Sequence, residues 1–233
     1  METTVRVPRG VSFLLAWAAW AVATVVGGLV YGLILYVGFS IASAVSLSTT
    51  AANNTLSPQR IALYTALALL IDPFLAAALG GIPTAFLIGR LDAPERRILR
   101  RLMWIIATGV GGLLVIGYLA ADITGPINWD EVRYFYAPVT AIVALLTTSA
   151  QALALLRLVS PFALVFYIPI TMIGWVIGWS IALLNSSGTS ISVVLWYTAP
   201  FLCIGICSGV ILAPRLSARL FVPQPRPAHQ PAA

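Results

Sequence analysis

The chain has 233 residues, of which 60% are hydrophobic and only 9% carry a charge. A water-soluble domain of this length needs many more ionisable side chains than the 13 basic and 7 acidic residues found here. The mean hydropathy of +0.98 points the same way. The composition therefore excludes an ordinary soluble protein and predicts a chain that lies in a lipid bilayer.

Residues that carry common membrane chemistries are rare in this sequence. Lysine is absent, so neither a retinal-type Schiff base nor the lysine of an ATP-binding P-loop is available. The single histidine, His229, lies in a proline-rich tail, and Cys203 and Cys207 are too few for an iron–sulfur cluster or a four-ligand zinc site. We expect no catalytic residue, no cofactor, no bound metal and no nucleic-acid partner.

Six apolar stretches are long enough to cross the hydrocarbon core as helices, which takes about 20 residues each. They cover residues 11–45, 61–89, 98–121, 134–156, 161–184 and 191–213. These are continuous runs without alternation, so we predict an all-α fold, a polytopic transmembrane helical bundle with six transmembrane helices. Residues 1–10 are expected to form a cytoplasmic N-terminus, and residues 214–233 a disordered, proline-rich cytoplasmic tail.

The arginines predict the orientation of these helices. With six spans, eleven of the 13 arginines fall on one side of the membrane, and only Arg60 and Arg133 fall on the other. Because basic residues concentrate on the cytoplasmic side, both termini are expected in the cytoplasm, with the chain in a bacterial inner membrane. The first apolar run is longer than the core of a signal peptide, which indicates an uncleaved first helix.

Asp72 is the strongest single candidate for a functional residue, because a carboxylate in an apolar helix usually marks a path for an ion or a substrate. Gly80, Gly81 and Pro83 follow in the same stretch and predict a broken helix, as ion-coupled carriers use. An alternative remains open. Asp72 and Pro73 would then start the helix at the outer boundary, and the glycines would only kink it and allow tight packing.

A second candidate site lies at the start of the third span. Asp92 and Glu95 have the spacing of a capping box, which predicts a helix start. Four arginines follow on one face of that helix, with Ile98, Leu99 and Leu102 on the other: Arg96, Arg97, Arg100 and Arg101. We expect these arginines to contact anionic lipid headgroups or an acidic partner, or to act only as topology determinants.

Three pairs of glycines, each spaced one helical turn apart, allow close helix contacts. They are Gly28 with Gly32, Gly174 with Gly178, and Gly205 with Gly209. We expect most of these faces to pack within the chain, and the alternative is that one of them meets another membrane-protein subunit. Membrane lipids and such subunits are therefore the expected partners.

Aromatic and capping residues predict several local positions. Trp17, Trp20 and Trp104 are expected in a belt at the cytoplasmic surface, and Trp175 and Trp179 in one at the outer surface. Ser160 and Pro161 predict a cap and a first helical residue for the fifth span, after a tight turn that starts at Arg157. Residues 128–131 repeat the capping spacing and predict a short interfacial helix.

Two functions follow from these patterns. The first is a structural or accessory subunit of a membrane complex, which the short loops and the small-residue faces favour. The alternative is a small-solute or ion-coupled transporter or binding component, which uses Asp72 near the broken second helix. An enzyme is not favoured, because Asp72 and scattered hydroxyls are the only groups that could do acid–base work inside the spans.

Overall fold

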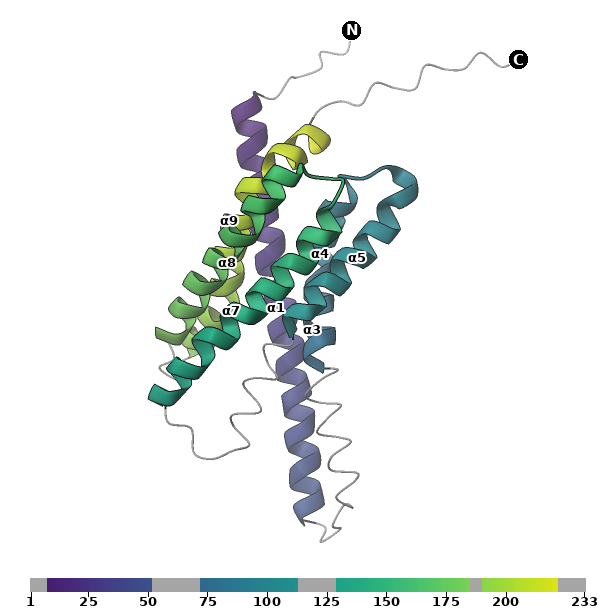
Figure 1. Cartoon of the computed structure of the whole chain (residues 1–233). Helices are drawn as coiled ribbons and strands as arrows, with labels where there is room; N and C mark the ends of the chain where they lie inside the picture. Colours follow the sequence, from purple (N-terminus) through teal and green to yellow (C-terminus); the bar gives the residue numbers. More distant parts are fainter. Residues whose placement is uncertain (1–7, 52–71, 113–128, 185–189, 222–233) are drawn as a thin grey trace, which may run out of the picture.

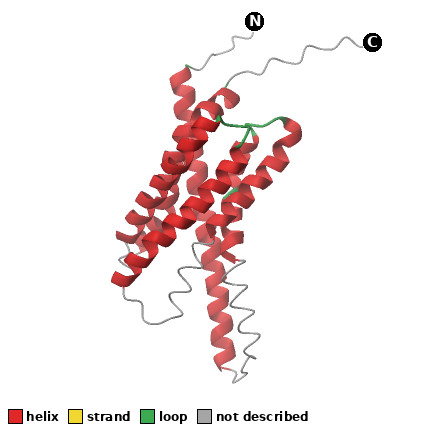
Figure 2. Ribbon diagram, viewed as in Figure 1, coloured by secondary structure: helices red, strands yellow, loops and turns green. Residues whose placement is uncertain are grey.

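The computed structural model describes residues 8–51, 72–112, 129–184 and 190–221, with side chains for 8–38, 73–112, 141–182 and 198–221. Over these residues the regular secondary structure is helical, which confirms the all-α prediction (Figure 2). In chain order the elements are α1 (Arg9–Ala51), α3 (Asp72–Gly80), α4 (Ile82–Gly89), η2 (Pro94–Arg96), α5 (Arg97–Gly109), η3 (Val110–Gly112), α7 (Trp129–Leu155), α8 (Pro161–Leu184) and α9 (Ser190–Leu220).

Three helices are long and apolar enough to cross a membrane, namely Arg9–Gly38 of α1, Pro161–Ala182 of α8 and Thr198–Leu220 of α9. The bounds of α8 coincide with those of the fifth predicted span. α9 continues to Leu220, so residues 214–220 are helical rather than part of the predicted tail. The remainder of that tail lies outside the described residues.

The other predicted spans are described in part. α7 is one continuous helix from Trp129, so the prediction of a separate short helix there is wrong. The second predicted span is described from Asp72 onward, and Gly81 separates α3 from α4. Gly81 keeps right-handed helical angles, and its N–H still donates to the Ala77 carbonyl, so the backbone is interrupted there without being unwound. Residues 61–71 of this span, and residues 113–121 of the third, lie outside the described part of the chain.

The helices contact one another in a closed ring (Figure 1). α1 packs along α9, α9 along α8, and α8 along α7. α7 contacts α5, and α3 and α4 contact both α5 and α1, which completes the ring. The first residues of α1 and the last of α9 lie at the same end of the bundle, the upper end in Figure 1.

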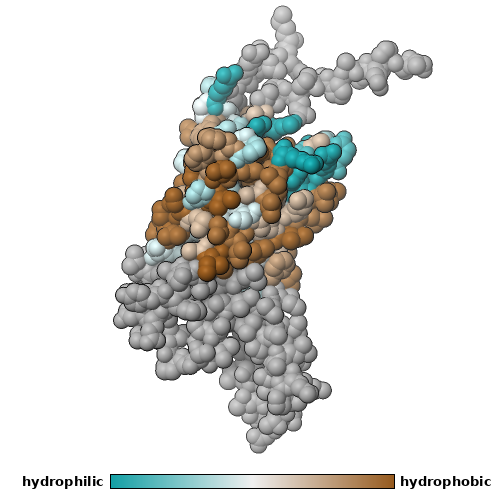
Figure 3. Space-filling model, viewed as in Figure 1, coloured by the Kyte–Doolittle hydropathy of each residue, from teal (hydrophilic) through white to brown (hydrophobic). Residues whose placement is uncertain are grey.

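The outside of this ring is apolar. Phe162, Ile98 and Val165 are 74%, 71% and 67% exposed. Figure 3 shows hydrophobic residues over the middle of one face and hydrophilic residues gathered toward the upper end. A broad apolar surface of this kind is stable against lipid and not against water. Together with the three long apolar helices, it points to association with a membrane.

Close backbone contacts hold α1 against α3. A Cβ atom added to Gly27 would overlap the carbonyl of Gly80, and one added to Gly80 would lie 2.7 Å from the Gly27 oxygen.

The predicted glycine pairs also pack inside the chain, where Gly32 is buried. Gly28 packs against Phe201, Gly174 against Cys203 and Ile204, Gly178 against Pro200, Gly205 against Ala21 and Thr24, and Gly209 against Trp17 and Trp20.

The turn between α7 and α8 follows the predicted pattern. Ser160 Oγ accepts a hydrogen bond from the Ala163 N–H at 3.3 Å, and Pro161 is the first residue of α8. The predicted cap and helix start are therefore confirmed. Arg157 adopts a φ of 71°, in the left-handed region that glycine usually occupies where a helix ends.

The connection between α4 and α5 differs from the predicted capping box. Ala93 precedes η2, and no side chain caps it. Asp92 Oδ1 accepts a hydrogen bond from the Ala93 N–H at 2.8 Å, and Oδ2 accepts one from Arg100 Nε at 3.1 Å. The prediction is wrong because one carboxylate oxygen binds the Ala93 N–H, which precedes the helix, and the other binds the Arg100 guanidinium, a charged donor.

Gly27→Ala should destabilise the fold, because the added Cβ meets a backbone carbonyl that cannot rotate away. Overpacking of this kind costs about 1–3 kcal/mol, so the melting temperature in detergent should fall. Gly10→Ala is the matched control, since nothing lies within 4 Å of its added Cβ. If Gly27→Ala and the parent protein have the same melting temperature, α1 and α3 do not cross at these glycines.

Candidate functional site

The interior of the helical ring is rich in aromatic side chains. Trp20 of α1 and Trp104 of α5 are each 2% exposed, and their rings pack edge to face with centroids 5.7 Å apart. Trp175 of α8 is also buried. The predicted surface belts are therefore wrong for these three tryptophans. For Trp20 and Trp104, an inward indole ring buries a large apolar area while its N–H still finds a partner.

Trp20 and Trp104 belong to the same local motif, in which a tryptophan precedes a threonine by four residues on one helix face. The Thr24 hydroxyl donates a hydrogen bond to the Trp20 carbonyl at 2.8 Å, and the Thr108 hydroxyl donates one to the Trp104 carbonyl at 2.9 Å. The indole then reaches a neighbouring helix. Trp20 Nε1 donates to Ser208 Oγ of α9 at 2.9 Å.

The break at Gly81 is bonded to this aromatic pair. Thr84 Oγ1 donates a hydrogen bond to the Gly81 carbonyl at 2.9 Å and accepts one from Trp104 Nε1 at 2.8 Å. The Gly81 N–H donates to the carbonyls of Ala77 and Ala78, both at 3.0 Å. The polar groups at the break are thus paired inside the protein, and the Trp104 indole holds α4 against α5.

Gln151 of α7 links two further helices across the interior. Its side-chain nitrogen donates a hydrogen bond to Thr108 Oγ1 at 3.2 Å, and its side-chain oxygen accepts one from the Tyr167 hydroxyl at 2.9 Å. Both Gln151 and Tyr167 are buried. Because buried polar groups are stable only when they are paired, these bonds fix the positions of α5, α7 and α8 relative to one another.

These side chains surround a cavity of about 60 Å³. A cavity of this volume has room for a few water molecules or for a compact polar group. Residues from every helix of the ring contribute to its wall, and the described lining residues are aromatic, uncharged polar or apolar. They include Trp20, Trp104, Trp175, Trp179, Thr147 and Gln151.

Thr147 differs from its neighbours in the interior. The hydroxyls of Thr24, Thr108 and Thr148 each donate to the carbonyl four residues earlier in their own helix. Thr147 is 1% exposed and lines the cavity, and its Oγ1 has no hydrogen-bond partner among the described residues. A buried hydroxyl without a partner is costly. Thr147 therefore gives the cavity wall a polar group that the fold itself does not use.

The predicted ion or substrate site coincides with this cavity in part. Gly80 lines the cavity, and Gly81 accepts the Thr84 hydrogen bond beside it. Pro83 lies in the first turn of α4 and is half-buried. Asp72 is the first described residue of α3, but its side chain lies outside the described part of the chain. The structure thus brings Gly80 to the cavity wall, and Gly81 lies next to it in the chain.

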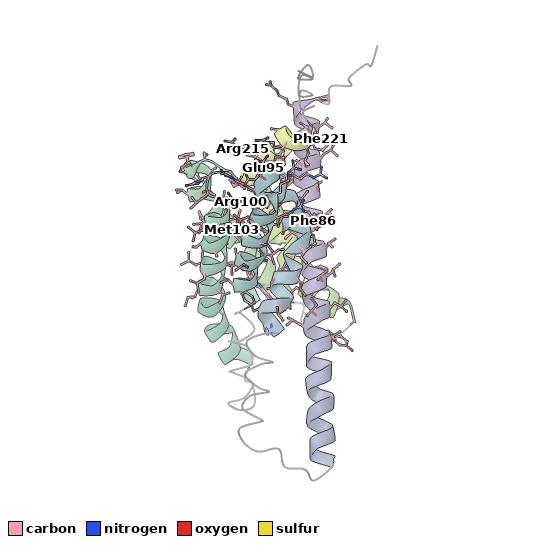
Figure 4. All side chains as sticks on the ribbon, turned by 90° about the vertical axis from the view of Figure 1, so that its right-hand side faces the viewer. Phe86, Glu95, Arg100, Met103, Arg215 and Phe221 are labelled. Carbon is pink, nitrogen blue, oxygen red and sulfur yellow. The ribbon has the colours of Figure 1, made fainter. Side chains whose placement is uncertain are left out.

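The predicted arginine site is divided among several contacts. Arg100 Nη1 donates a hydrogen bond to the Ala154 carbonyl at 2.6 Å, and the guanidinium of Arg101 lies over the Phe86 ring, 4.6 Å from its centroid. Arg96 is exposed and Arg97 is half-buried. Residues predicted for the opposite face are well exposed, at 71%, 62% and 51% for Ile98, Leu99 and Leu102. Figure 4 shows Arg100 near the upper end of the bundle, with Glu95 and Arg215.

The described residues contain no group of three or more histidine, cysteine, aspartate or glutamate side chains that could hold a metal ion. Cys203 and Cys207 are free thiols.

The chain matches no protein family, and no curated protein or solved structure is significantly similar to it. The geometry of the cavity is therefore the basis for a functional proposal.

The sequence carried a signal for this cavity that hydropathy did not use. Polar and aromatic residues recur four positions apart within apolar helices, which places them on one helix face. Such a face in an apolar span points to the protein interior rather than to lipid. The pairs are Trp20 with Thr24, Trp104 with Thr108, Thr147 with Gln151, and Trp175 with Trp179.

Thr84→Val should destabilise the protein, because the buried Trp104 indole N–H loses its acceptor. An unpaired buried donor costs about 1–3 kcal/mol, so the melting temperature in detergent should fall. Thr84→Ser keeps the hydroxyl and should melt close to the parent protein. Equal losses in the valine and serine variants would show that packing of the methyl group matters, and not the hydrogen bond.

Proposed function

We propose that this chain is an integral membrane protein that binds a small, uncharged solute in its central cavity, as the binding component of a carrier. The Thr147 hydroxyl carries the proposal, since it is buried, lines the cavity and has no partner among the described residues. Gln151 and Tyr167 supply further amide and hydroxyl groups close by. The apolar outer surface and the three long apolar helices support a location in a membrane.

The lining favours a compact, uncharged solute with a few hydrogen-bonding groups and a small apolar part. The rings of Trp20, Trp104 and Trp175 offer that apolar part a contact surface. The described wall offers hydroxyl and amide groups but no ionised side chain to balance a charge. Transfer of an uncompensated charge to such a site costs far more than transfer of a hydroxyl or an amide.

We further propose six membrane spans in a bacterial inner membrane, with both termini and the connection between α4 and α5 in the cytoplasm. The start of α1 and the end of α9 lie at one end of the bundle, which supports an even number of crossings (Figure 1). In a chain whose two cysteines are replaced by serine, a cysteine at Arg97 should react with an impermeant reagent only after the cells are opened. Labelling of intact cells would contradict this orientation.

Thr147→Val should weaken solute binding at least about tenfold by removing one hydrogen bond to the ligand. It should leave the melting temperature unchanged or raise it, because the buried hydroxyl that it removes has no partner among the described residues. The measurement is a screen of neutral and charged solutes by tryptophan fluorescence and by uptake into liposomes, since four tryptophans line the cavity.

Thr148→Val is the matched control for that variant. The Thr148 hydroxyl donates to the Ala144 carbonyl at 2.7 Å within its own helix, and Thr148 is not among the lining residues. This variant should bind the solute as the parent protein does. Equal solute affinities for Thr147→Val and the parent protein would show that the cavity is not the binding site.

Asp72→Asn tests a separate role. Loss of uptake in this variant with unchanged solute binding would place ion coupling, and not solute recognition, at Asp72.

An accessory subunit remains the competing prediction. The glycine faces on which it partly depended pack within the chain wherever their neighbours are described, which leaves less surface for a partner subunit. If no solute in the screen binds, and the protein purifies in mild detergent with a stoichiometric membrane partner, the accessory role replaces the carrier role.

A further inference from the structure

A second hollow lies at the arginine-rich end of the bundle, apart from the central cavity. Its volume is about 300 Å³, and three separate segments of the chain form its wall. The connection after α4 contributes Asp92, the turn before α8 contributes Arg157, and the last turns of α9 contribute Arg215 and Arg219. Figure 4 shows Arg215 near the upper end of the bundle. Three guanidinium groups from two parts of the fold therefore surround one space.

The backbone brings these three arginines to one hollow, where all three are exposed. Arg215 and Arg219 are four residues apart on α9, so their side chains lie on one helix face. Arg157 has a φ of 71°, a backbone angle that residues other than glycine rarely adopt. A glycine there would end α7 with less strain, yet the chain places an arginine at this position, and this arginine lines the same hollow as the α9 pair.

Asp92 does not neutralise the three arginines, because its carboxylate is already engaged. Oδ1 accepts a hydrogen bond from the Ala93 N–H. Oδ2 accepts one from Arg100 Nε, and these two side chains form an ion pair. Burial acts to raise the pKa of Asp92, but the Ala93 hydrogen bond and the Arg100 guanidinium outweigh it, so the pKa lies below its usual range. The carboxylate is thus ionised and held by Arg100, which does not line the hollow.

We propose that this hollow binds the phosphate of an anionic phospholipid headgroup through Arg157, Arg215 and Arg219. Guanidinium groups bind phosphate oxygens through paired hydrogen bonds, and basic pockets at the ends of membrane helices hold acidic lipid headgroups. Leu156 and Phe162, which flank the turn, are 45% and 74% exposed and give acyl chains an apolar surface beside the headgroup. The site differs from the predicted one on α5, where Arg100 and Arg101 turn to contacts within the protein.

The test is native mass spectrometry of the full chain in mild detergent, titrated with phosphatidylglycerol or with phosphatidylcholine. The parent protein should bind phosphatidylglycerol at least about tenfold more tightly than phosphatidylcholine. Arg215→Gln combined with Arg219→Gln should remove that preference. The matched control combines Arg9→Gln with Arg90→Gln, which lowers the charge equally at exposed arginines outside the hollow, and it should keep the preference.

Arg157→Gly separates binding from folding. It removes a guanidinium but suits the left-handed backbone, so its melting temperature should equal or exceed that of the parent protein while the lipid preference falls. Three results would overturn the proposal. They are an unchanged preference in the Arg215 and Arg219 variant, an equal loss in the control variant, and displacement of the lipid by millimolar inorganic phosphate, which would indicate a soluble phosphate ligand.

Discussion

The indole N–H groups of Trp20 and Trp104 must find acceptors inside the bundle, since both rings are almost fully buried. Their acceptors, the hydroxyls of Ser208 and Thr84, belong to α9 and α4. In lipid, apolar burial hardly distinguishes one neighbouring helix from another, because acyl chains are as apolar as leucine. A directional hydrogen bond does distinguish them. These two bonds therefore determine which helices stand beside α1 and α5, and so which side chains can reach the cavity.

Glycines make these bonds geometrically accessible, because an indole reaches a hydroxyl on the next helix only where the two backbones approach closely. Gly209 packs on the rings of Trp17 and Trp20, at the contact where Trp20 bonds to Ser208. Gly81 packs on Thr108 beside the bond from Trp104 to Thr84. Gly80 and Gly81 thus allow tight packing, one of the two roles that the sequence allows for them. The same break presents Gly80 to the cavity.

Sequence predicted the features that depend on local chemistry. The continuous apolar run of α8 and the Ser160 cap before it needed only neighbouring residues, and the structure confirms both. It failed where a distant partner intervened. The Asp92 carboxylate is bound by Arg100, eight residues later, instead of capping a helix. The sequence predicts Trp20 and Trp104 at the membrane surface, because hydropathy cannot separate an inward indole from an interfacial one. That distinction depends on hydroxyl partners 188 and 20 residues away.

The placement of charge follows from the same medium. Among the described residues the cavity wall is uncharged, whereas Asp92, Arg157, Arg215 and Arg219 gather around a hollow at one end. Hydroxyls and aromatic rings can hold a neutral solute in a low-dielectric interior, but an ionised group there would need a paired counter-charge. At the end of the bundle, water and lipid headgroups can stabilise an ionised group. Arg100 donates a hydrogen bond to the Ala154 carbonyl in the last turn of α7 and also forms an ion pair with the Asp92 carboxylate. The arginines around the hollow are thereby left for an anion from outside the chain.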